Sequence, residues 1–295
     1  MLIDTSINSA STLNEVEWVD THAHLNFPAF KDDASEVIRR SLDNGVWLIN
    51  VGSQYTTSKR AVEIAEKYEQ GVYAAIGLHP IYARDEFDYQ RYKKLTDSKK
   101  VVAIGEIGLD YKKEYASFKE KQRTVLCKQL NLAEELDLPV IFHCRMAHQD
   151  LLEILLKFQH INKSTGVDLL IKGVIHCFTG NWKQAEEYLE MGFYLGFNGI
   201  IFKLDLDGII KKVPLERILI ETDCPYLTPP ISVNQFTPTP NFGVGASNQH
   251  KSAFIRNEPL YIKYIAKKIS ELKNTTFEEI TKITFQNAKN LFKIG

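Results

Sequence analysis

The chain has 295 residues, 44% of them hydrophobic and 25% charged, and its formal net charge is −1. This composition predicts a globular protein with a large core, and the balanced charge excludes a global positive field that would attract nucleic acid or an anionic membrane surface. No apolar run approaches the roughly 18 residues of a transmembrane helix, and residues 1–16 form a polar tail without the pattern of a signal peptide.

Short runs rich in β-branched residues alternate with longer amphipathic patterns along the chain. Eight runs are predicted as strands: Trp18–Leu25, Val46–Val51, Val72–Leu78, Val101–Ile107, Pro139–Cys144, Lys172–Phe178, Phe193–Asn198 and Ile218–Asp223. The helical patterns between them include Ala34–Leu42, Ser58–Tyr68, Phe118–Leu136, His148–Phe158 and Trp182–Glu190. Strict alternation implies parallel strands joined by helices, so residues 17–295 are predicted to form a single α/β domain, a (β/α)₈ TIM-type barrel. A doubly wound open sheet is the competing architecture.

The last part of the chain departs from this rhythm. Pro229–Arg256 is rich in Pro, Ser, Asn, Thr and Gly and separates the last strand from a helix that begins near Glu258. Loops of this length in a compact domain are usually functional or disordered. The run Thr275-Thr276-Phe277-Glu278-Glu279 has the pattern of a capping box and predicts an extra C-terminal helix.

Histidines and acidic residues lie at the carboxyl ends of the predicted strands, where barrel enzymes build their active sites. His22 and His24 are two residues apart in the first strand and therefore point to one face. The fourth, fifth, sixth and eighth strands end in Glu106, His143, His176 and Asp223, respectively. A lone histidine is usually structural, but one metal site explains all six residues more economically. Six such ligands are enough for two divalent ions, Mg²⁺, Mn²⁺ or Zn²⁺, that share a bridging carboxylate.

Four cysteines in a chain of this length do not make a disulfide framework, so we expect a cytoplasmic or otherwise reducing compartment. Cys144, Cys177 and Cys224 each directly follow one of the six residues. Since side chains alternate along a strand, these three should point away from the barrel interior. Cys127 lies in a helical pattern. We expect all four to be buried packing residues, which leaves a site with nitrogen and oxygen ligands only.

Other polar residues are expected around the same mouth. His79 ends the third strand and Arg145 lies just beyond the fifth. The Arg145 guanidinium either binds a phosphate group or pairs with a carboxylate such as Asp150. Glu221 shares the face of Asp223 and is a candidate for contact with substrate. The remaining histidines are interpreted as surface or loop residues: His148, His160 and His250.

Six segments of the chain carry these residues. They are Val19-Asp20-Thr21-His22-Ala23-His24-Leu25, Gly77-Leu78-His79-Pro80, Gly105-Glu106-Ile107-Gly108-Leu109-Asp110-Tyr111, Phe142-His143-Cys144-Arg145, His176-Cys177-Phe178-Thr179-Gly180 and Glu221-Thr222-Asp223-Cys224-Pro225-Tyr226-Leu227. In this order they resemble the signature blocks of TatD-type deoxyribonucleases, a family of the amidohydrolase superfamily of metal-dependent barrels. Arg256-Asn257-Glu258-Pro259 is similar to a further block of that family.

The resemblance implies a distorted barrel and a divalent-metal site active on DNA, with 3′→5′ exonuclease activity reported in the family. By position, it implies one ion held by His22, His24 and Asp223 and a second held by His143 and His176, with Glu106 bridging the two. In the mechanism that we expect, the ions activate a water molecule for in-line attack on a phosphodiester. Asp223 orients or deprotonates that water, while His79 and Arg145 bind the non-bridging phosphate oxygens.

Two other readings remain open. The same superfamily supports metal-dependent hydrolysis of small amides, esters or lactones, and the fold does not separate these reactions because the site sets the chemistry. A non-catalytic binding protein on the same barrel is a third possibility, against which the intact ligand set argues. The expected partner is DNA, with a single-stranded or frayed end favoured, and neither a membrane nor an obligate protein partner is expected.

The family reaches the block that begins at Arg256 soon after its last strand, whereas here a longer segment intervenes. Because Pro229–Arg256 leaves the carboxyl end of a barrel strand, we expect it at the active-site face. Its aromatic and cationic residues suit single-stranded DNA, whose bases stack while its phosphates pair with Lys or Arg. A loop without contact to substrate, or a contact between subunits, is the open alternative.

Overall fold

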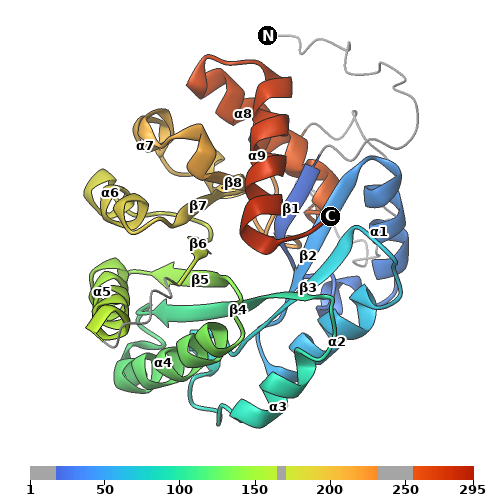
Figure 1. Ribbon diagram of the computed structural model, residues 1–295. Coiled ribbons are helices and arrows are strands. Elements are labelled where there is room, and N and C mark those ends of the chain that lie inside the picture. Colours follow the sequence, from blue (N-terminus) through green and yellow to red (C-terminus); the bar gives the residue numbers. More distant parts are fainter. Residues whose placement is uncertain (1–17, 165–170, 232–254) are drawn as a thin grey trace, which may run out of the picture.

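The computed structural model describes residues 18–164, 171–231 and 255–295, and the side chains in these ranges except those of 159–164. Eight parallel strands follow one another in chain order around a single sheet (Figure 1). Their bounds are Trp18–Ala23 (β1), Val46–Val51 (β2), Val72–Ile76 (β3), Val101–Asp110 (β4), Val140–Arg145 (β5), Gly173–Ile175 (β6), Tyr194–Phe197 (β7) and Ile218–Ile220 (β8). All eight strand predictions are confirmed.

The sheet closes between its first and last strands at their carboxyl ends. Ala23 and Cys224 form a parallel bridge, and the backbone N–H of Asp223 donates to the carbonyl of His22 at 2.8 Å. The N–H of His24 donates to the carbonyl of Cys224 at 2.9 Å. The predicted barrel is therefore confirmed and the open sheet is wrong. The same bonds hold the segments that carry His22, His24 and Asp223 side by side.

Nine α-helices connect and cover the strands in the described ranges. They are Ala34–Asp43 (α1), Tyr55–Ala65 (α2), Tyr89–Leu95 (α3), Lys119–Glu135 (α4), His148–Ser164 (α5), Trp182–Glu190 (α6), Asp207–Lys212 (α7), Ile262–Lys273 (α8) and Phe277–Phe292 (α9). Short 3₁₀ helices lie at Pro28–Phe30 (η1), Pro80–Tyr82 (η2), Ala116–Phe118 (η3), Gly199–Phe202 (η4), Leu215–Arg217 (η5) and Pro259–Tyr261 (η6). The sequence patterns missed α3 and α7, because helices of two turns or fewer show too little periodicity.

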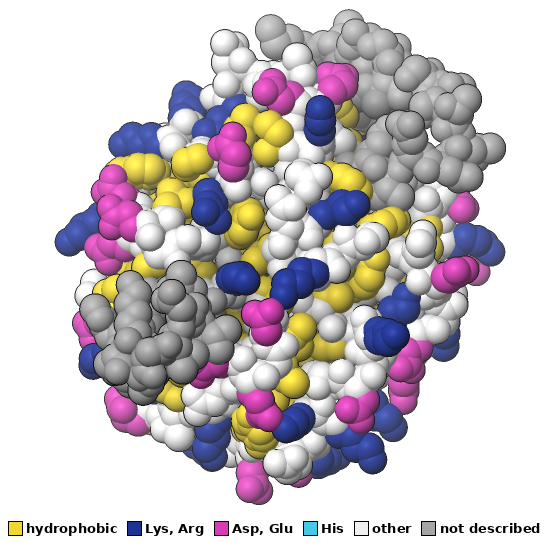
Figure 2. All heavy atoms as spheres, viewed as in Figure 1, with side chains coloured by type: hydrophobic (Ala, Val, Ile, Leu, Met, Phe, Trp, Pro, Cys, Tyr) yellow, Lys and Arg dark blue, Asp and Glu magenta, His cyan; other side chains and the backbone are white. Residues whose placement is uncertain are grey.

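The predicted C-terminal helix is α9, and it covers the amino-terminal end of the barrel. The Thr276 hydroxyl accepts from the N–H of Glu279 at 3.1 Å, as the capping pattern indicates. Asn287 donates its amide to the carbonyls of Leu215 and Ile218 at the start of β8, both at 2.8 Å. Figure 1 views the molecule from this end, with α9 in front of β1, and Figure 2 shows that this face carries mixed Lys, Arg, Asp and Glu side chains and no visible histidine. The histidine cluster lies at the opposite end.

β4 is longer than its sequence pattern indicates, and this length positions the site. Its register with β5 shifts between Gly105 and Ile107, after which pairing continues to Asp110. Gly108 makes this possible, because its φ of +147° is unfavourable for other residues and an added Cβ would lie 1.9 Å from the carbonyl oxygen of His143. β4 therefore brings both Glu106 and Asp110 to the mouth of the barrel.

His148 was expected at the surface, and that expectation is wrong. It begins α5 with 8% of its surface exposed, its ring lies near those of Phe178 and Tyr188, and its Nδ1 is 3.2 Å from the Tyr188 hydroxyl. Burial lowers the pKa of His148 from 6.5 to about 4. The helical pattern that begins at His148 did not reveal that its first residue turns inward.

His148 should therefore make the fold sensitive to acid. Because its pKa is lower in the folded chain, the unfolded chain binds more protons, and the free energy of unfolding should fall by about 3 kcal/mol between pH 7 and pH 4 from this residue alone. His148→Asn keeps a polar group for Tyr188 but cannot titrate. Urea unfolding of both proteins should be measured in EDTA at pH 7 and pH 4. The free energy of unfolding should fall less in the variant, and an equal fall in both proteins would show that His148 is not the source of the acid sensitivity.

Several predictions fall outside the described residues: the polar tail at 1–16, residues 232–254 of the Pro229–Arg256 segment, and the side chains of His160 and His250. Within the ranges that are described, no helix is long and apolar enough to cross a membrane.

Candidate metal centre

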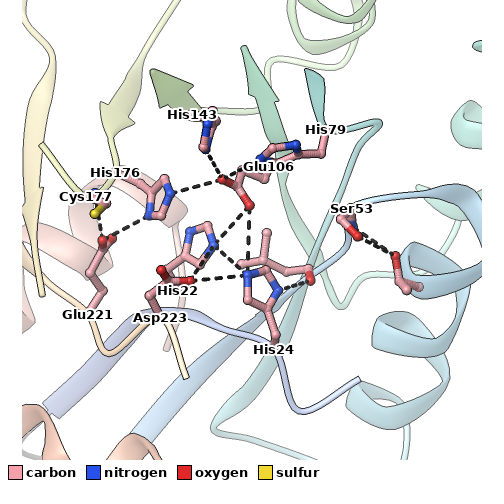
Figure 3. Close-up of polar contacts among 12 residues, drawn as sticks. His22, His24, Ser53, His79, Glu106, His143, His176, Cys177, Glu221 and Asp223 are labelled. Atoms are coloured by element: carbon pink, nitrogen blue, oxygen red, sulfur yellow. Dashed lines mark hydrogen bonds and ion pairs between the residues drawn. The ribbon is translucent and has the colours of Figure 1, made fainter. Parts of the chain in front are cut away.

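The carboxylate of Glu106 lies at the centre of the polar cluster in Figure 3, with the side chain 6% exposed. One oxygen, Oε2, faces residues at the carboxyl ends of β1 and β8. It lies 3.4 Å from Nε2 of His22 and 3.9 Å from Nε2 of His24. Asp223 completes this group, since its Oδ1 is 3.4 Å from Nε2 of His24 and 3.9 Å from Nε2 of His22.

The other oxygen, Oε1, faces a second set of imidazoles. It is 2.7 Å from Nδ1 of His143, 3.0 Å from Nε2 of His176 and 3.3 Å from Nε2 of His79. Glu106 therefore stands between two groups of nitrogen and oxygen atoms, each near one of its oxygens. The structure brings together all six residues that the sequence placed at strand ends.

The geometry of the first group fits a divalent cation. Nε2 of His22 and Nε2 of His24 are 3.1 Å apart, and His24 Nδ1 lies 2.8 Å from the carbonyl oxygen of Val51, to which it must donate. In neutral His24, Nε2 then carries a lone pair that points into the cluster. Bonds of about 2.1 Å from one ion would place tetrahedral ligands about 3.4 Å apart, which matches the spacing of this group. Nitrogen and oxygen donors of this kind suit divalent ions.

His176 is oriented in the same way by a buried carboxylate. Its Nδ1 lies 3.0 Å from Oε1 of Glu221, and that oxygen also accepts from the N–H of Cys177 at 2.8 Å and from the amide of Asn198 at 2.9 Å. Glu221 thus keeps Nε2 of His176 turned toward Glu106. Glu221 is 0% exposed, so the expected contact between Glu221 and substrate does not agree with the structure.

His79 differs from His24 and His176 in which nitrogen carries its proton. The N–H of Ile81 donates to Nδ1 of His79 at 3.2 Å, so in the neutral ring the proton is on Nε2, which faces Glu106. Burial lowers the pKa of His79 to about 4 in spite of the nearby negative charge of Glu106. His79 is therefore a neutral hydrogen-bond donor at the mouth, which suits an oxygen of a substrate better than a metal ion.

The carboxylates of the cluster are held in the ionised form. Burial alone would raise the pKa of Glu106, but its electrostatic interactions with the imidazoles of His79, His176 and His22 and the hydrogen bond from His143 outweigh it and hold that pKa well below its usual value. Burial likewise opposes the lowering of the Asp223 pKa, which the hydrogen bond from His24 and the nearby histidine charges produce. Two anionic groups in a buried pocket are the environment that binds cations.

One residue of the cluster was missed in the sequence. Oδ2 of Asp110 lies 3.1 Å from Nε2 of His143, and Asp110 is 2% exposed. Burial would raise its pKa, but the hydrogen bond from His143 lowers it below the usual value. The signal was present, because Glu106, Gly108 and Asp110 alternate along one face if the strand continues past Ile107.

Arg145 ends β5 with an exposed side chain. It makes no salt bridge with Asp150, whose carboxylate instead accepts from Arg123 at 2.8 Å and from the Tyr111 hydroxyl at 2.7 Å. The alternative pairing with Asp150 is therefore wrong. The guanidinium of Arg145 is exposed at the rim of the barrel, where it interacts electrostatically with Glu114.

The cysteines stand apart from the cluster. Cys144 and Cys224 are buried as expected, Cys177 is partly buried with its Sγ 3.5 Å from Oδ1 of Asn198, and Cys127 is exposed, against expectation. Burial raises the pKa of Cys144 and of Cys177 to about 12, so both remain thiols. No cysteine belongs to the groups of potential metal ligands found among the described residues.

Comparisons with known proteins agree with this picture. A family model described as TatD related DNase matches residues 19–293. A metal-dependent hydrolase of Bacillus subtilis, YabD, is 42% identical over 94% of this chain and 99% of its own length. The 3′-5′ ssDNA/RNA exonuclease TatD of Yersinia pseudotuberculosis is 29% identical over 93% of this chain and 99% of its own. The crystal structure of YJJV, a TatD homolog from Escherichia coli, superposes with a TM-score of 0.78 at 28% identity, over 95% of this chain and 99% of that one.

Proposed function

The chain belongs to the family of TatD-related DNases and is a metal-dependent hydrolase, and from that premise we propose that it hydrolyses phosphodiester bonds in DNA as a 3′→5′ exonuclease. The observation that carries the proposal is the position of Glu106 between two groups of ligands. A carboxylate shared in this way is suited to two metal ions, which clamp the attacking and leaving oxygens of a phosphoryl group.

The residues divide into two sets around Glu106. His22, His24 and Asp223 would hold one ion, His143 and His176 would hold the other, and Glu106 would bridge them. When bound, two divalent ions polarise the phosphodiester and make water a better nucleophile at neutral pH. Mg²⁺, Mn²⁺ and Zn²⁺ all suit such ligands.

The remaining residues act on water and substrate. The side chain of Asp223 is 15% exposed against 6% for Glu106, so Asp223 is the carboxylate that solvent reaches more easily, and it orients or deprotonates the attacking water. His79 donates the proton on Nε2 to a non-bridging phosphate oxygen, and the exposed Arg145 binds a second one. Glu221 acts through His176, which it keeps in the orientation that faces Glu106.

The charge of the chain supports a local mode of substrate binding. With a net charge of −1, the protein has no general attraction for a polyanion, so the metal ions and Arg145 would supply the positive charge that DNA meets. The name of the Yersinia relative includes ssDNA and RNA, and it supports a preference for single-stranded or frayed ends. The expected cytoplasmic location and the absence of an obligate protein partner remain predictions.

Digestion of 5′-end-labelled single- and double-stranded DNA, with Mg²⁺, Mn²⁺ and Zn²⁺ titrated separately into EDTA-treated protein, tests the proposal. The expected product is a ladder that shortens from the 3′ end, faster for the single strand. A phosphorothioate linkage at the 3′ end should slow digestion, whereas one at the 5′ end should leave the rate of digestion unchanged. Turnover of simple esters, amides or lactones without cleavage of DNA at any metal concentration would assign the site to small molecules instead.

A further inference from the structure

Tyr226 is an exposed aromatic residue beside the metal cluster. It follows Asp223 by three residues, it is 52% exposed, and its ring centroid lies 6.4 Å from that of His24 in an edge-on arrangement. The other large hydrophobic residues exposed in the described ranges are not aromatic: Met146, Leu156 and Leu204. An exposed tyrosine at the mouth of a site offers a ring surface on which a ligand can pack.

The backbone beneath this ring is fixed. The N–H of Tyr226 donates to the carbonyl of Asp223 at 2.9 Å, and the amide of Asn257 donates to the carbonyls of Tyr226 at 2.6 Å and of Thr222 at 2.8 Å. Asn257 is 0% exposed, so water does not compete for these bonds. A ring held on a rigid turn loses little conformational freedom when a ligand packs on it.

A second aromatic ring lies against His24. The Phe27 ring stacks on the imidazole of His24 with centroids 4.2 Å apart and is partly exposed. Phe27 and Tyr226 therefore both lie near the ring of His24, and this flank of the cluster presents aromatic surface close to Asp223.

We propose that Tyr226 is a stacking platform for one of the two nucleobases that flank the scissile phosphate, and that it sets how tightly a DNA end is held. The inference rests on the proposed function and deepens it. Every base has a π-face, so a neutral aromatic ring holds DNA without selecting a sequence, as an enzyme that removes successive nucleotides requires. Asn257 is the positioning residue that keeps the platform next to Asp223.

Tyr226→Ala, Tyr226→Phe and the unmodified protein should be compared on short single-stranded oligonucleotides. We expect Tyr226→Ala to raise KM about 10-fold with a smaller change in kcat, because stacking on an aromatic ring contributes to binding. Tyr226→Phe should restore KM, since it keeps the ring. Metal content should be the same in all three proteins. Leu204→Ala, which removes an exposed apolar side chain after η4, is the matched control and should leave KM unchanged.

Abasic substrates separate stacking from a general structural effect. An abasic nucleotide on one side of the scissile phosphate should raise the KM of the unmodified protein to that of Tyr226→Ala. An abasic nucleotide on the other side should leave the difference in KM between the two proteins unchanged. With 2-aminopurine at the sensitive position and an uncleavable methylphosphonate at the scissile bond, binding should quench fluorescence for Tyr226 and Tyr226→Phe and much less for Tyr226→Ala.

The possible failures are distinct. No cleavage of DNA by the unmodified protein overturns the proposed function, and the inference with it. Cleavage with the same KM for Tyr226→Ala and the unmodified protein overturns the inference alone. The inference is also overturned if Tyr226→Ala still has a higher KM than the unmodified protein on a substrate with abasic nucleotides on both sides of the scissile phosphate. The ring would then act on something other than a base.

Discussion

Glu106→Ala is expected to lower hydrolysis by at least about 100-fold, because loss of a shared metal ligand should cost several kcal/mol of transition-state stabilisation. Both oxygens of Glu106 face groups of imidazoles, so its removal disturbs both sets of ligands at once. Metal bound per chain, measured by elemental analysis after dialysis, should fall in parallel with the rate. More than about a tenth of the original rate in this variant would mean that Glu106 does not bridge the two groups.

The fold should survive this substitution. The barrel is stabilised by apolar residues such as Val102, Ile104 and Ile141, none of which lies at the mouth of the barrel, and circular dichroism should be unchanged. Glu66→Ala is the matched control, because Glu66 is an exposed glutamate at the end of α2, on the side of the barrel where β3 begins. It should retain full activity and full metal content, so that any loss in Glu106→Ala reports on the site.

Asp223→Asn is expected to lower kcat by about 100-fold, within the range ascribed to a general base, while binding more metal than Glu106→Ala does. The amide keeps the size of the carboxylate and an oxygen donor but cannot accept a proton from water. Asp223 touches only one of the two groups, near His22 and His24, so His143 and His176 should still bind an ion.

Measurements of kcat and of metal content under the same conditions distinguish a role of Asp223 in activating water from a role as a metal ligand. Asp32→Asn makes the same chemical change at an exposed carboxylate in the segment that follows β1, and it should have no effect. An Asp223→Asn protein that keeps its metal and its kcat would assign the activation of water to another residue. If it instead lost as much metal as Glu106→Ala, Asp223 would be chiefly a ligand.

Much of the architecture could be predicted because it depends on local sequence patterns. Alternation of β-branched runs with amphipathic helices implies parallel strands, and parallel strands in a barrel bring their carboxyl ends together. His22, Glu106, His143 and Asp223 each stand at such an end, so their meeting follows from the order of elements alone. The chain's membership of the TatD-related DNase family was likewise evident from short blocks of sequence.

The errors concern properties that neighbouring elements decide. β4 reaches Asp110 because β5 pairs with it beyond the shift at Glu106, and the alternation of Glu106, Gly108 and Asp110 indicates a shared face only once that pairing is known. His148 is buried because the rings of Phe178 and Tyr188, distant in sequence, cover it. Asp150 bonds to Arg123 and not to Arg145 for the same reason, since the arrangement of α4 and β5 places Arg123 closer.

The sequence by itself determined the barrel, the residues that meet at its mouth and the nitrogen and oxygen character of their donor atoms. The tertiary structure alone decided what each of these groups presents to the site. His24 turns Nε2 inward because Val51 accepts from Nδ1, and His176 does so because Glu221, 45 residues away, accepts from its Nδ1. In His79 the proton is on Nε2 instead, because the N–H of Ile81 donates to Nδ1. A hydrogen bond to one ring nitrogen determines which atom carries the proton, and the partners of His24 and His176 are close only in the folded chain.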